Sequence, residues 1–438
     1  MKRFYGRERE LALLKKMESQ SKVSATFTLL MGRRRIGKTE LARQIMEQSE
    51  MACYLFTIKT AESMLASMWQ ECLFSDLGLR ISGRVDNLKD LFNEIFVFSL
   101  TNHFTLVIDE FQDLQKINES FFSELQNLWD RYKNGSKMNL IVSGSILSMM
   151  VKIFEDSKEP LFGRSTAKLV LTPFPPSTIK EILSDYNPDY SNEDLLCLYM
   201  LTGGVPRYLS LLLDGGAYTK DEMIKAATEP YSPFLSDAKD ILVSEMGKDY
   251  SIYFSILSLI ADGYTTQSEI DSVIGKNTGA YIEKLENIFC VIRKNKPLFS
   301  SKESRRAHWK IIDANMKFYF RFIYPNQNLI ELEQFYTLRN IVNRDYDTFT
   351  GKTLETYFVE LLKEKGGFSM LGSWWDSKGQ NEIDIVSIDF SDKSCTLYEV
   401  KRNKSKYNPD KLAEKAEIFK KNIAGFKTEL IGLSIENM

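Results

Sequence analysis

The feature that most constrains this chain is an eight-residue loop, Gly32-Arg33-Arg34-Arg35-Ile36-Gly37-Lys38-Thr39, which fits the pattern G-x-x-x-x-G-K-S/T. The loop follows the apolar, β-rich run 25–31 and precedes the helical pattern 40–46. Glycines let such a loop curl so that its backbone N–H groups face a phosphate, and the start of the next helix adds partial positive charge. The loop therefore predicts a phosphate site on a strand–loop–helix unit rather than a chance glycine-rich turn.

Further apolar runs alternate with helical patterns, at 51–56, 104–108, 139–142 and 168–171. Continuous apolar strands separated by helices are typical of a parallel sheet covered on both faces. The expected fold class is therefore α/β, with the parallel sheet of a P-loop NTPase.

Two acids, Asp109 and Glu110, directly follow the apolar run 104–108. An ordinary helix N-cap would also explain them, but after such a strand they suit a Walker B site. We expect Lys38 to reach the β- and γ-phosphates, Thr39 and Asp109 to hold Mg²⁺, and Glu110 to polarise the attacking water. The expected cofactors are ATP and Mg²⁺. The nucleotide-binding residues expected here are Gly32, Arg33, Arg34, Arg35, Ile36, Gly37, Lys38, Thr39 and Glu40.

Composition limits the remaining possibilities. With 438 residues, about three domains are expected. Lys and Arg number 57 against 59 Asp and Glu, so only a local patch can attract nucleic acid. Five cysteines without a C-x-x-C pair, and only two histidines, place any metal on carboxylates. No window of about 18 uninterrupted apolar residues exists, so we expect a cytoplasmic protein without a membrane span.

Segment 1–240 resembles the AAA+-related P-loop ATPases of the archaeal-ATPase/STAND type. Besides the loop and the acids, the resemblance rests on Phe4-Tyr5-Gly6-Arg7-Glu8, Ser143-Gly144-Ser145, Leu161-Phe162-Gly163-Arg164 and Gly203-Gly204-Val205-Pro206-Arg207. It implies that Tyr5, Gly6 and Pro206 lie against adenine. It also implies that Ser143 is a sensor and that Arg164 is an arginine finger, acting in its own chain or on a neighbouring copy in a homo-oligomer. From the residues alone, Ser143 could cap a helix, Arg164 could bind a surface acid, and Pro206 could start a helix.

A winged helix-turn-helix is expected between the ATPase-like part and the C-terminal segment. Helical patterns at 250–260, 267–270 and 278–288 precede two strand-like runs at 291–293 and 309–312. Segment 293–310 holds one acid, Glu303, and seven basic residues: Arg293, Lys294, Lys296, Lys302, Arg305, Arg306 and Lys310. A basic wing suits DNA phosphates. Glu283 and Glu286 on the candidate recognition helix favour the alternative, an intramolecular lid.

The C-terminal segment carries carboxylates in two strand-like runs, 382–388 and 395–400. Residues two apart in a strand share a face, so Glu382 lies beside Asp384, and Glu399 beside Lys401. If the strands pair as a hairpin, these groups converge, and Mg²⁺ suits such oxygen ligands. The alternative is a solvated edge hairpin with ordinary alternating charges.

This segment resembles the PD-(D/E)xK nuclease fold, with Asp384 as the lead acid and Glu399-Val400-Lys401 as the second half. Glu355 matches the acid that many members carry on their first helix. The resemblance implies a metal held by Glu355, Asp384 and Glu399, with Asp384, Glu399 and Lys401 catalytic. Basic residues also dominate the stretch 401–421.

We therefore expect four parts: a P-loop ATPase core (1–170), a helical lid (171–245), a winged helix (246–325) and an α/β restriction-endonuclease-like domain (326–438). The predicted function is Mg²⁺-dependent ATP hydrolysis on or with DNA, as an ATP-gated nuclease. The alternative is a STAND-like nucleotide switch or DNA-binding regulator whose C-terminal domain is not catalytic.

Overall fold

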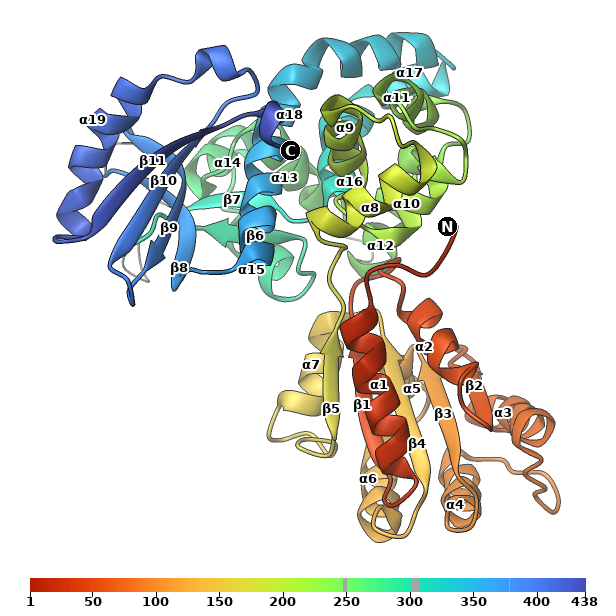
Figure 1. Ribbon diagram of the computed structural model, residues 1–438. Helices are drawn as coiled ribbons and strands as arrows, with labels where there is room; N and C mark the ends of the chain where they lie inside the picture. Colours follow the sequence, from red (N-terminus) through yellow and green to blue (C-terminus); the bar gives the residue numbers. More distant parts are fainter. Residues whose placement is uncertain (247–249, 301–306, 378) are drawn as a thin grey trace. The chain divides into compact units, whose positions relative to one another are not determined.

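The computed structural model describes residues 1–246, 250–300, 307–377 and 379–438 (Figure 1). The chain folds into two compact units. The first consists of residues 2–172, and the second consists of Met1 with residues 173–438. Each unit is described by itself.

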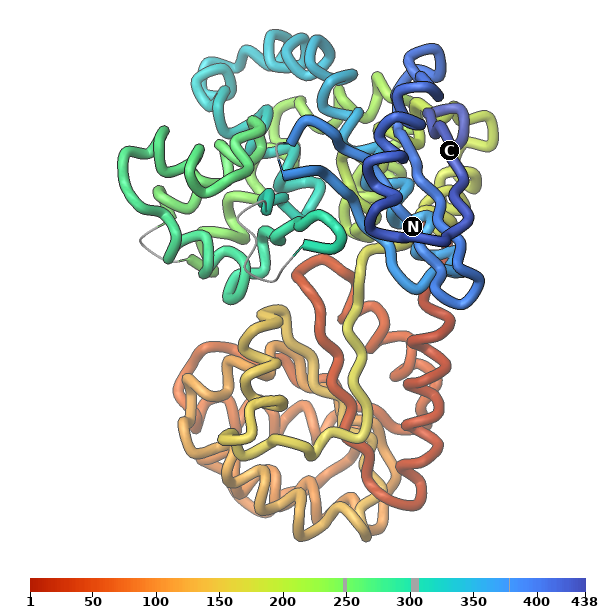
Figure 2. The backbone as a smooth tube through the Cα atoms, turned by 90° about the vertical axis from the view of Figure 1, so that its left-hand side faces the viewer, coloured from red at the N-terminus to blue at the C-terminus, as the bar shows by residue number. Residues whose placement is uncertain are grey.

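The first unit is built on a five-stranded parallel sheet in the order β2-β3-β4-β1-β5. Its strands are β1 (Thr26–Met31), β2 (Ala52–Phe56), β3 (Phe104–Asp109), β4 (Met138–Gly144) and β5 (Ala167–Val170). The expected α/β class and parallel sheet are confirmed. Figure 2 shows β5 running beside β1, which it joins in parallel register with Val170 opposite Met31.

Seven helices surround this sheet (Figure 1), and they enclose an aromatic core. They are α1 (Glu8–Ser21), α2 (Lys38–Met46), α3 (Glu62–Leu77), α4 (Leu88–Ser99), α5 (Leu114–Ile117), α6 (Phe121–Tyr132) and α7 (Leu147–Glu155). Phe27 of β1 contacts Trp129 of α6 and Phe154 of α7, with ring centroids 5.1 and 5.5 Å apart. Helices α6 and α7 therefore both pack on β1 through this one side chain.

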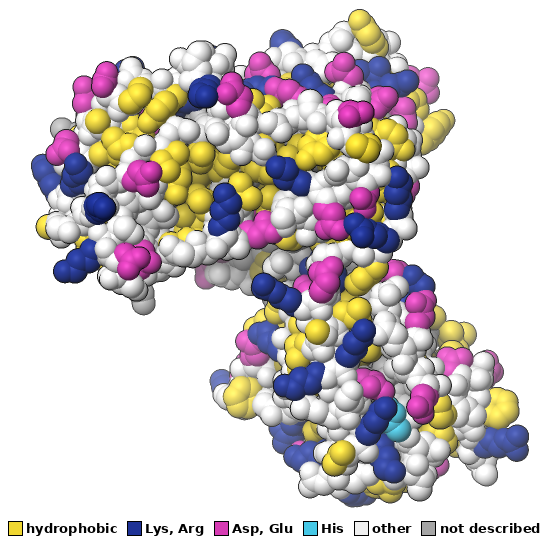
Figure 3. All heavy atoms as spheres, viewed as in Figure 1, with side chains coloured by type: hydrophobic (Ala, Val, Ile, Leu, Met, Phe, Trp, Pro, Cys, Tyr) yellow, Lys and Arg dark blue, Asp and Glu magenta, His cyan; other side chains and the backbone are white. Residues whose placement is uncertain are grey.

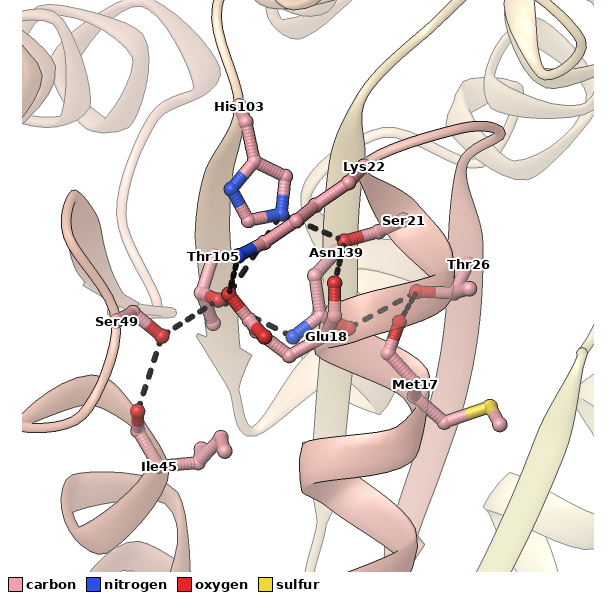
Figure 4. A network of polar contacts seen from close by, with 10 residues as sticks. All are labelled: Met17, Glu18, Ser21, Lys22, Thr26, Ile45, Ser49, His103, Thr105 and Asn139. Atoms are coloured by element: carbon pink, nitrogen blue, oxygen red, sulfur yellow. Dashed lines mark hydrogen bonds and ion pairs between the residues drawn. The ribbon is translucent and has the colours of Figure 1, made fainter.

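Polar side chains tie the strands together near their amino ends (Figure 4). Asn139 of β4 accepts a hydrogen bond from Thr26 at 3.0 Å and donates one to Thr105 at 3.1 Å. Thr105 lies 2.9 Å from the hydroxyl of Ser49, which follows α2. Buried polar groups in such a network must all find partners, so it fixes the relative register of β1, β3 and β4.

The second unit begins with a helical region, in the part of the chain where a helical lid was expected at 171–245. Its helices are α8 (Pro176–Tyr186), α9 (Asn192–Thr202), α10 (Pro206–Leu213), α11 (Lys220–Thr228) and α12 (Asp237–Met246). Helices α9 and α11 both begin with a capping box, Ser191 with Asp194 and Thr219 with Glu222. Reciprocal bonds of this kind satisfy backbone N–H groups that the first helical turn leaves open.

The elements expected for the winged helix occur in the predicted order: α13 (Tyr250–Asp262), α14 (Gln267–Ile274), α15 (Gly279–Asn287), β6 (Ile292–Asn295) and β7 (His308–Ile311). Strands β6 and β7 form an antiparallel pair, with Arg293 opposite Lys310. Four charged residues predicted at its tip, Lys302, Glu303, Arg305 and Arg306, lie outside the described residues. The identity of this region as a winged helix stays a prediction.

The chain continues through α16 (Ala314–Phe318), α17 (Gln327–Glu331) and the long helix α18 (Phe335–Lys365) to a mixed sheet. The sheet order is β11-β10-β9-β8, with β10 parallel to β11 and the other pairs antiparallel. The bounds are β8 (Met370–Trp375), β9 (Glu382–Asp389), β10 (Ser394–Val400) and β11 (Lys427–Leu433), with α19 (Pro409–Phe419) before β11.

The predicted hairpin of 382–388 and 395–400 is confirmed as β9 and β10. Strand β11, which follows α19 and pairs with β10, was not predicted. Strand β8 was not expected either. Within the described ranges, no helix is both long and apolar enough to cross a membrane.

Candidate nucleotide site and carboxylate face

The phosphate loop, the two acids and Ser143 meet at one edge of the first sheet. The loop leaves β1, Asp109 ends β3, and Ser143 lies near the end of β4. Because β4 lies between β3 and β1 and all three are parallel, their carboxyl ends are neighbours. The structure thus brings together residues that are up to about a hundred positions apart in sequence.

Lys38 lies under its own loop. Its Nζ donates to the carbonyl oxygens of Gly32 at 2.8 Å and Arg33 at 3.1 Å, and the residue is 8% exposed. Burial lowers the pKa of Lys38, while the carboxylates of Glu110 and Asp109 act in the opposite direction. A cation held by two carbonyl oxygens can turn to a stronger anionic partner when a phosphate enters.

Asp109 is the most heavily bonded carboxylate of this edge. One oxygen accepts hydrogen bonds from Ser143 and from the backbone N–H of Glu110, the latter at 2.9 Å. The other accepts from Thr39 Oγ1 at 3.1 Å and from the Tyr54 hydroxyl at 2.5 Å. A threonine hydroxyl beside a carboxylate offers the hard oxygen ligands that Mg²⁺ prefers. Ser143 therefore contacts Asp109 rather than only capping the next helix.

Glu110 is oriented by two neutral donors. Its Oε2 accepts from Ser145 at 2.8 Å and from Gln112 Nε2 at 2.5 Å. Gly144 leaves room for this arrangement, since a Cβ there would stand 2.6 Å from Gln112 Oε1 and 2.5 Å from Met150. These two donors fix the orientation of the carboxylate, which suits a general base.

Tyr54 was missed by the sequence analysis, as were Gln112 and Ser145. Tyr54 lies on β2, and nothing in the sequence tells which strand borders β3. Burial and the hydrogen bond to Asp109 raise the pKa of Tyr54 well above its usual value, so the hydroxyl stays protonated and donates. Tyr54 therefore orients the carboxylate of Asp109, although Tyr54 is not one of the predicted Mg²⁺ ligands.

We expect Tyr54→Phe to raise the Mg²⁺ concentration at half-maximal ATP hydrolysis by about tenfold, because residues that orient metal ligands commonly contribute that much. A Mg²⁺ titration of phosphate release measures it. Tyr132→Phe, which removes a hydroxyl bonded to Asn93 in the same unit, is the matched control. An unchanged Mg²⁺ requirement in Tyr54→Phe would contradict the assigned role.

The N-terminal segment is clamped to the phosphate loop by Arg7. Its guanidinium donates to the carbonyl oxygens of Ile36 at 3.3 Å and Thr172 at 2.7 Å. Tyr5 is 2% exposed, and Gly6 has a φ of 57°, which favours glycine. The structure thus holds Tyr5 and Gly6 next to residues that lead into the loop, while their contact with adenine stays a prediction.

One predicted residue, Arg164, does not join this site within its own chain. Arg164 precedes β5 and pairs with Asp130 at 2.9 Å. Since β5 and β1 are parallel, Arg164 lies at the edge opposite the loop, about 20 Å away along a six-residue strand. An arginine finger in the same chain is therefore not supported, and a role towards a second copy stays a prediction. The carboxylate of Glu40 pairs with Arg43 at 2.6 Å, and the predicted contact of Glu40 with the nucleotide stays a prediction.

Pro206 belongs to the second unit, where it is the first residue of α10. The preceding Gly204 has a φ of 81°, and a Cβ there would stand 2.3 Å from the carbonyl oxygen of Phe174. The glycine is therefore required for close packing on the segment that enters the unit. The adenine contact of Pro206 stays a prediction.

Three acids from separate elements of the second unit form what we call the carboxylate face: Glu355 of α18, Asp384 of β9 and Glu399 of β10. Asp384 accepts the backbone N–H of Val400 at 2.7 Å. Burial raises the pKa of Glu355, and the nearby carboxylate of Asp384 raises it further. Lys401 lies between two of the acids, 2.9 Å from Glu399 and 3.9 Å from Asp384.

Lysines, rather than a compact ligand set, neutralise this face. Lys352 pairs with Glu355 at 3.2 Å, and Lys415 lies 3.5 Å from Glu399. Across the described part of the chain, no three acidic, histidine or cysteine side chains form a group that could hold a metal ion. The second oxygen of Glu399 is nevertheless buried, with no hydrogen-bond partner among the described residues. The predicted metal role of the three acids stays a prediction, and it requires the lysines to move.

Arg402, next to Lys401, connects the carboxylate face to the helical region. Its guanidinium pairs with Glu193 of α9, pairs with Asp347 at 2.9 Å and donates to Thr350 at 2.8 Å. A shift of α9 would therefore reach the residue that follows Lys401 in the chain.

The hairpin β6–β7 is docked on the C-terminal sheet. The backbone N–H of Leu298 donates to Ser373 of β8 at 2.9 Å. A Cβ on Gly372 would stand 2.8 Å from the Leu298 side chain. His308 of β7 contacts Trp375, with ring centroids 5.1 Å apart. The basic wing predicted to contact DNA is thus partly engaged by its own chain.

Two family models match the chain. One describes an ATPase domain predominantly from Archaea and matches residues 4–212. The other describes "Archaea bacterial proteins of unknown function" and matches residues 319–413. An uncharacterized protein of Methanocaldococcus jannaschii is 30% identical over 408 residues, 91% of this chain and 87% of that protein.

Two solved structures share the fold. The Walker-type ATPase of Pyrococcus abyssi is 18% identical, with a TM-score of 0.54 over 72% of this chain and 96% of that one. The Aeropyrum pernix ORC2 protein, solved as ADPNP–ADP complexes, is 15% identical, with a TM-score of 0.51 over 75% and 94%. At these identities the likeness concerns the fold alone.

Proposed function

Because the chain belongs to the family of the Methanocaldococcus jannaschii protein and is an ATPase with the archaeal-type domain, we propose that it couples Mg²⁺-dependent ATP hydrolysis to an action on DNA. The observation that carries the ATP part is the meeting of Lys38, Thr39 and Asp109 at one sheet edge. The observation that carries the DNA part is the carboxylate face with Lys401 among its acids.

The residues of the phosphate site divide the work of hydrolysis. Lys38 leaves its two carbonyl oxygens and binds the β- and γ-phosphates, while the loop N–H groups face the remaining oxygens. Thr39 and Asp109 hold Mg²⁺, which supplies positive charge to the phosphates when bound. Glu110, oriented by Ser145, takes the proton of the attacking water.

The C-terminal domain supplies the DNA-acting chemistry in this proposal. Its carboxylate oxygens fit a hard divalent cation, and the buried, unpartnered oxygen of Glu399 supports that fit. Lys401 stabilises negative charge at the phosphate that is attacked. Arg402 ties this strand end to Glu193 of α9, which supports gating by ATP through the helical region.

A second candidate is a nucleotide-driven switch or DNA-binding regulator of the STAND type with a non-catalytic C-terminal domain. The docking of Leu298 on β8 favours it, because the hairpin is then engaged by its own chain. The pairing of Lys352 with Glu355 also favours it, because the lysine neutralises one acid of the carboxylate face. In that case the switch depends on ATP binding and hydrolysis, and the acids of the carboxylate face have no catalytic role.

Incubation of the protein with supercoiled plasmid and Mg²⁺, with and without ATP, separates the two candidates. We expect the wild type to nick the plasmid and Lys401→Ala to lose this activity, because the scissile phosphate then loses its cation. Lys421→Ala, a basic residue of the same stretch with an exposed side chain, is the matched control. Loss of nicking in Lys38→Ala would show that cleavage depends on ATP. Absence of cleavage by a wild type that still hydrolyses ATP would favour the switch.

A further inference from the structure

Three lysines border the carboxylate face, and we call them the lysine rim: Lys310 of β7, Lys317 of α16 and Lys352 of α18. They come from three elements, two of which precede the C-terminal domain. Figure 3 shows Lys, Arg, Asp and Glu side chains mixed on the face that it displays. A DNA-binding surface on this chain, whose net charge is −2, must therefore be a local cluster such as this one.

The lysines of the rim differ in exposure. Lys310 is exposed and Lys317 is half-buried. Burial nevertheless lowers the pKa of both, to about 8 for Lys317, and Glu355 is the acid that most opposes this effect in each case. Lys317 also stands over the ring of Phe349, 4.9 Å from its centroid.

Within the part of the chain that the structure describes, two of these cations lack a close anionic partner. Among the described residues, neither Lys310 nor Lys317 forms an ion pair, whereas Lys352 pairs with Glu355. Partly desolvated cations without partners favour the binding of an anion. The docking of Leu298 on Ser373 and of His308 on Trp375 holds β7, and Lys310 with it, against the C-terminal domain.

We propose that the lysine rim binds the phosphodiester backbone of a DNA strand and places that strand across the carboxylate face. The hairpin and the C-terminal domain then form one DNA surface instead of two. The inference rests on the proposed action on DNA and adds which residues take the phosphates. Lys310 and Lys317 are positioning residues here, because they hold the strand and do not touch the reacting atoms.

The test is DNA binding without cleavage. The full chain is titrated against a labelled duplex and the corresponding single strand in EDTA, and anisotropy is followed over a KCl series. We expect the double variant Lys310→Gln/Lys317→Gln to bind at least about tenfold more weakly at low salt. Its slope of log affinity against log salt should fall by about two, since each phosphate contact contributes about 0.9. Lys317→Arg, which keeps the charge, should bind like the wild type.

The matched control is Lys225→Gln/Lys239→Gln, which removes two exposed lysines of α11 and α12. Equal affinity and slope in both double variants, with a wild type that binds, would overturn the inference and leave the DNA-acting function standing. A wild type that hydrolyses ATP but binds neither the duplex nor the single strand would overturn both this inference and the proposed action on DNA. Thermal melting of the double variant shows whether it still folds. Its melting temperature should not fall, because the substitutions remove charges that are desolvated and form no ion pair within the described part of the chain.

Discussion

Lys38→Ala should reduce ATP hydrolysis by roughly 10²–10³-fold or more, the usual effect of removing one donor aimed at transition-state charge. The structure gives the reason. Lys38 is the buried cation of the loop and rests on the carbonyl oxygens of Gly32 and Arg33, so no other side chain takes its place without rebuilding the loop. Phosphate release at saturating ATP and Mg²⁺ measures the effect.

Nucleotide binding should weaken in the same variant, which a fluorescent ATP analogue reports. Lys16→Ala, on the exposed side of α1, is the control and should hydrolyse ATP normally. Since burial already disfavours the charge of Lys38, its removal should leave the melting temperature close to that of the wild type. Hydrolysis at the wild-type rate in Lys38→Ala would mean that the loop is not the ATP site.

Glu110→Gln should separate binding from chemistry. The amide oxygen can still accept the hydrogen bond of Ser145, so the site keeps its shape and binds ATP with Mg²⁺. It cannot accept a proton from water, and loss of a general base costs about 10²–10⁴-fold in rate. We therefore expect the variant to retain unhydrolysed ATP tightly. Identification of the nucleotide that stays bound through gel filtration, together with single-turnover phosphate release, measures this.

Glu119→Gln, an exposed acid of the same loop region, should behave as the wild type. If Glu110→Gln turned over ATP normally, the water would have to be activated elsewhere. If it failed to bind ATP, Glu110 would be needed for the shape of the site rather than for its chemistry.

The nucleotide site was largely predictable because its determinants are contiguous in sequence. Gly32 to Thr39 form the phosphate loop, and the apolar run that ends in Asp109 supplies the acids of the predicted Walker B site. Tyr54 was not predictable, because its contact with Asp109 depends on β2 lying beside β3, and strand order is set by packing. Arg164 was assigned by resemblance, and the parallel register of β5 places it at the opposite edge.

In the C-terminal domain, alternation of charged and apolar residues predicted β9 and β10, and the hairpin brought their acids together. Strand β8 was missed partly because Gly372 interrupts its pattern. That glycine is explained only by Leu298, which comes from another part of the chain and fills the space of a side chain. The lysine rim was equally hidden, since Lys310, Lys317 and Lys352 are close only in the folded unit.

The docking of Leu298 on β8 also affects whether the C-terminal domain can exist apart from the rest of the chain. Strand β8 is an outer strand of its sheet, and the hairpin segment covers part of its free side. A fragment confined to the matched span 319–413 would lose this cover and would also lack β11 beside β10. Two bare strand edges invite pairing between copies and aggregation. A C-terminal fragment that folds by itself should therefore include the hairpin and β11 as well as the matched span 319–413.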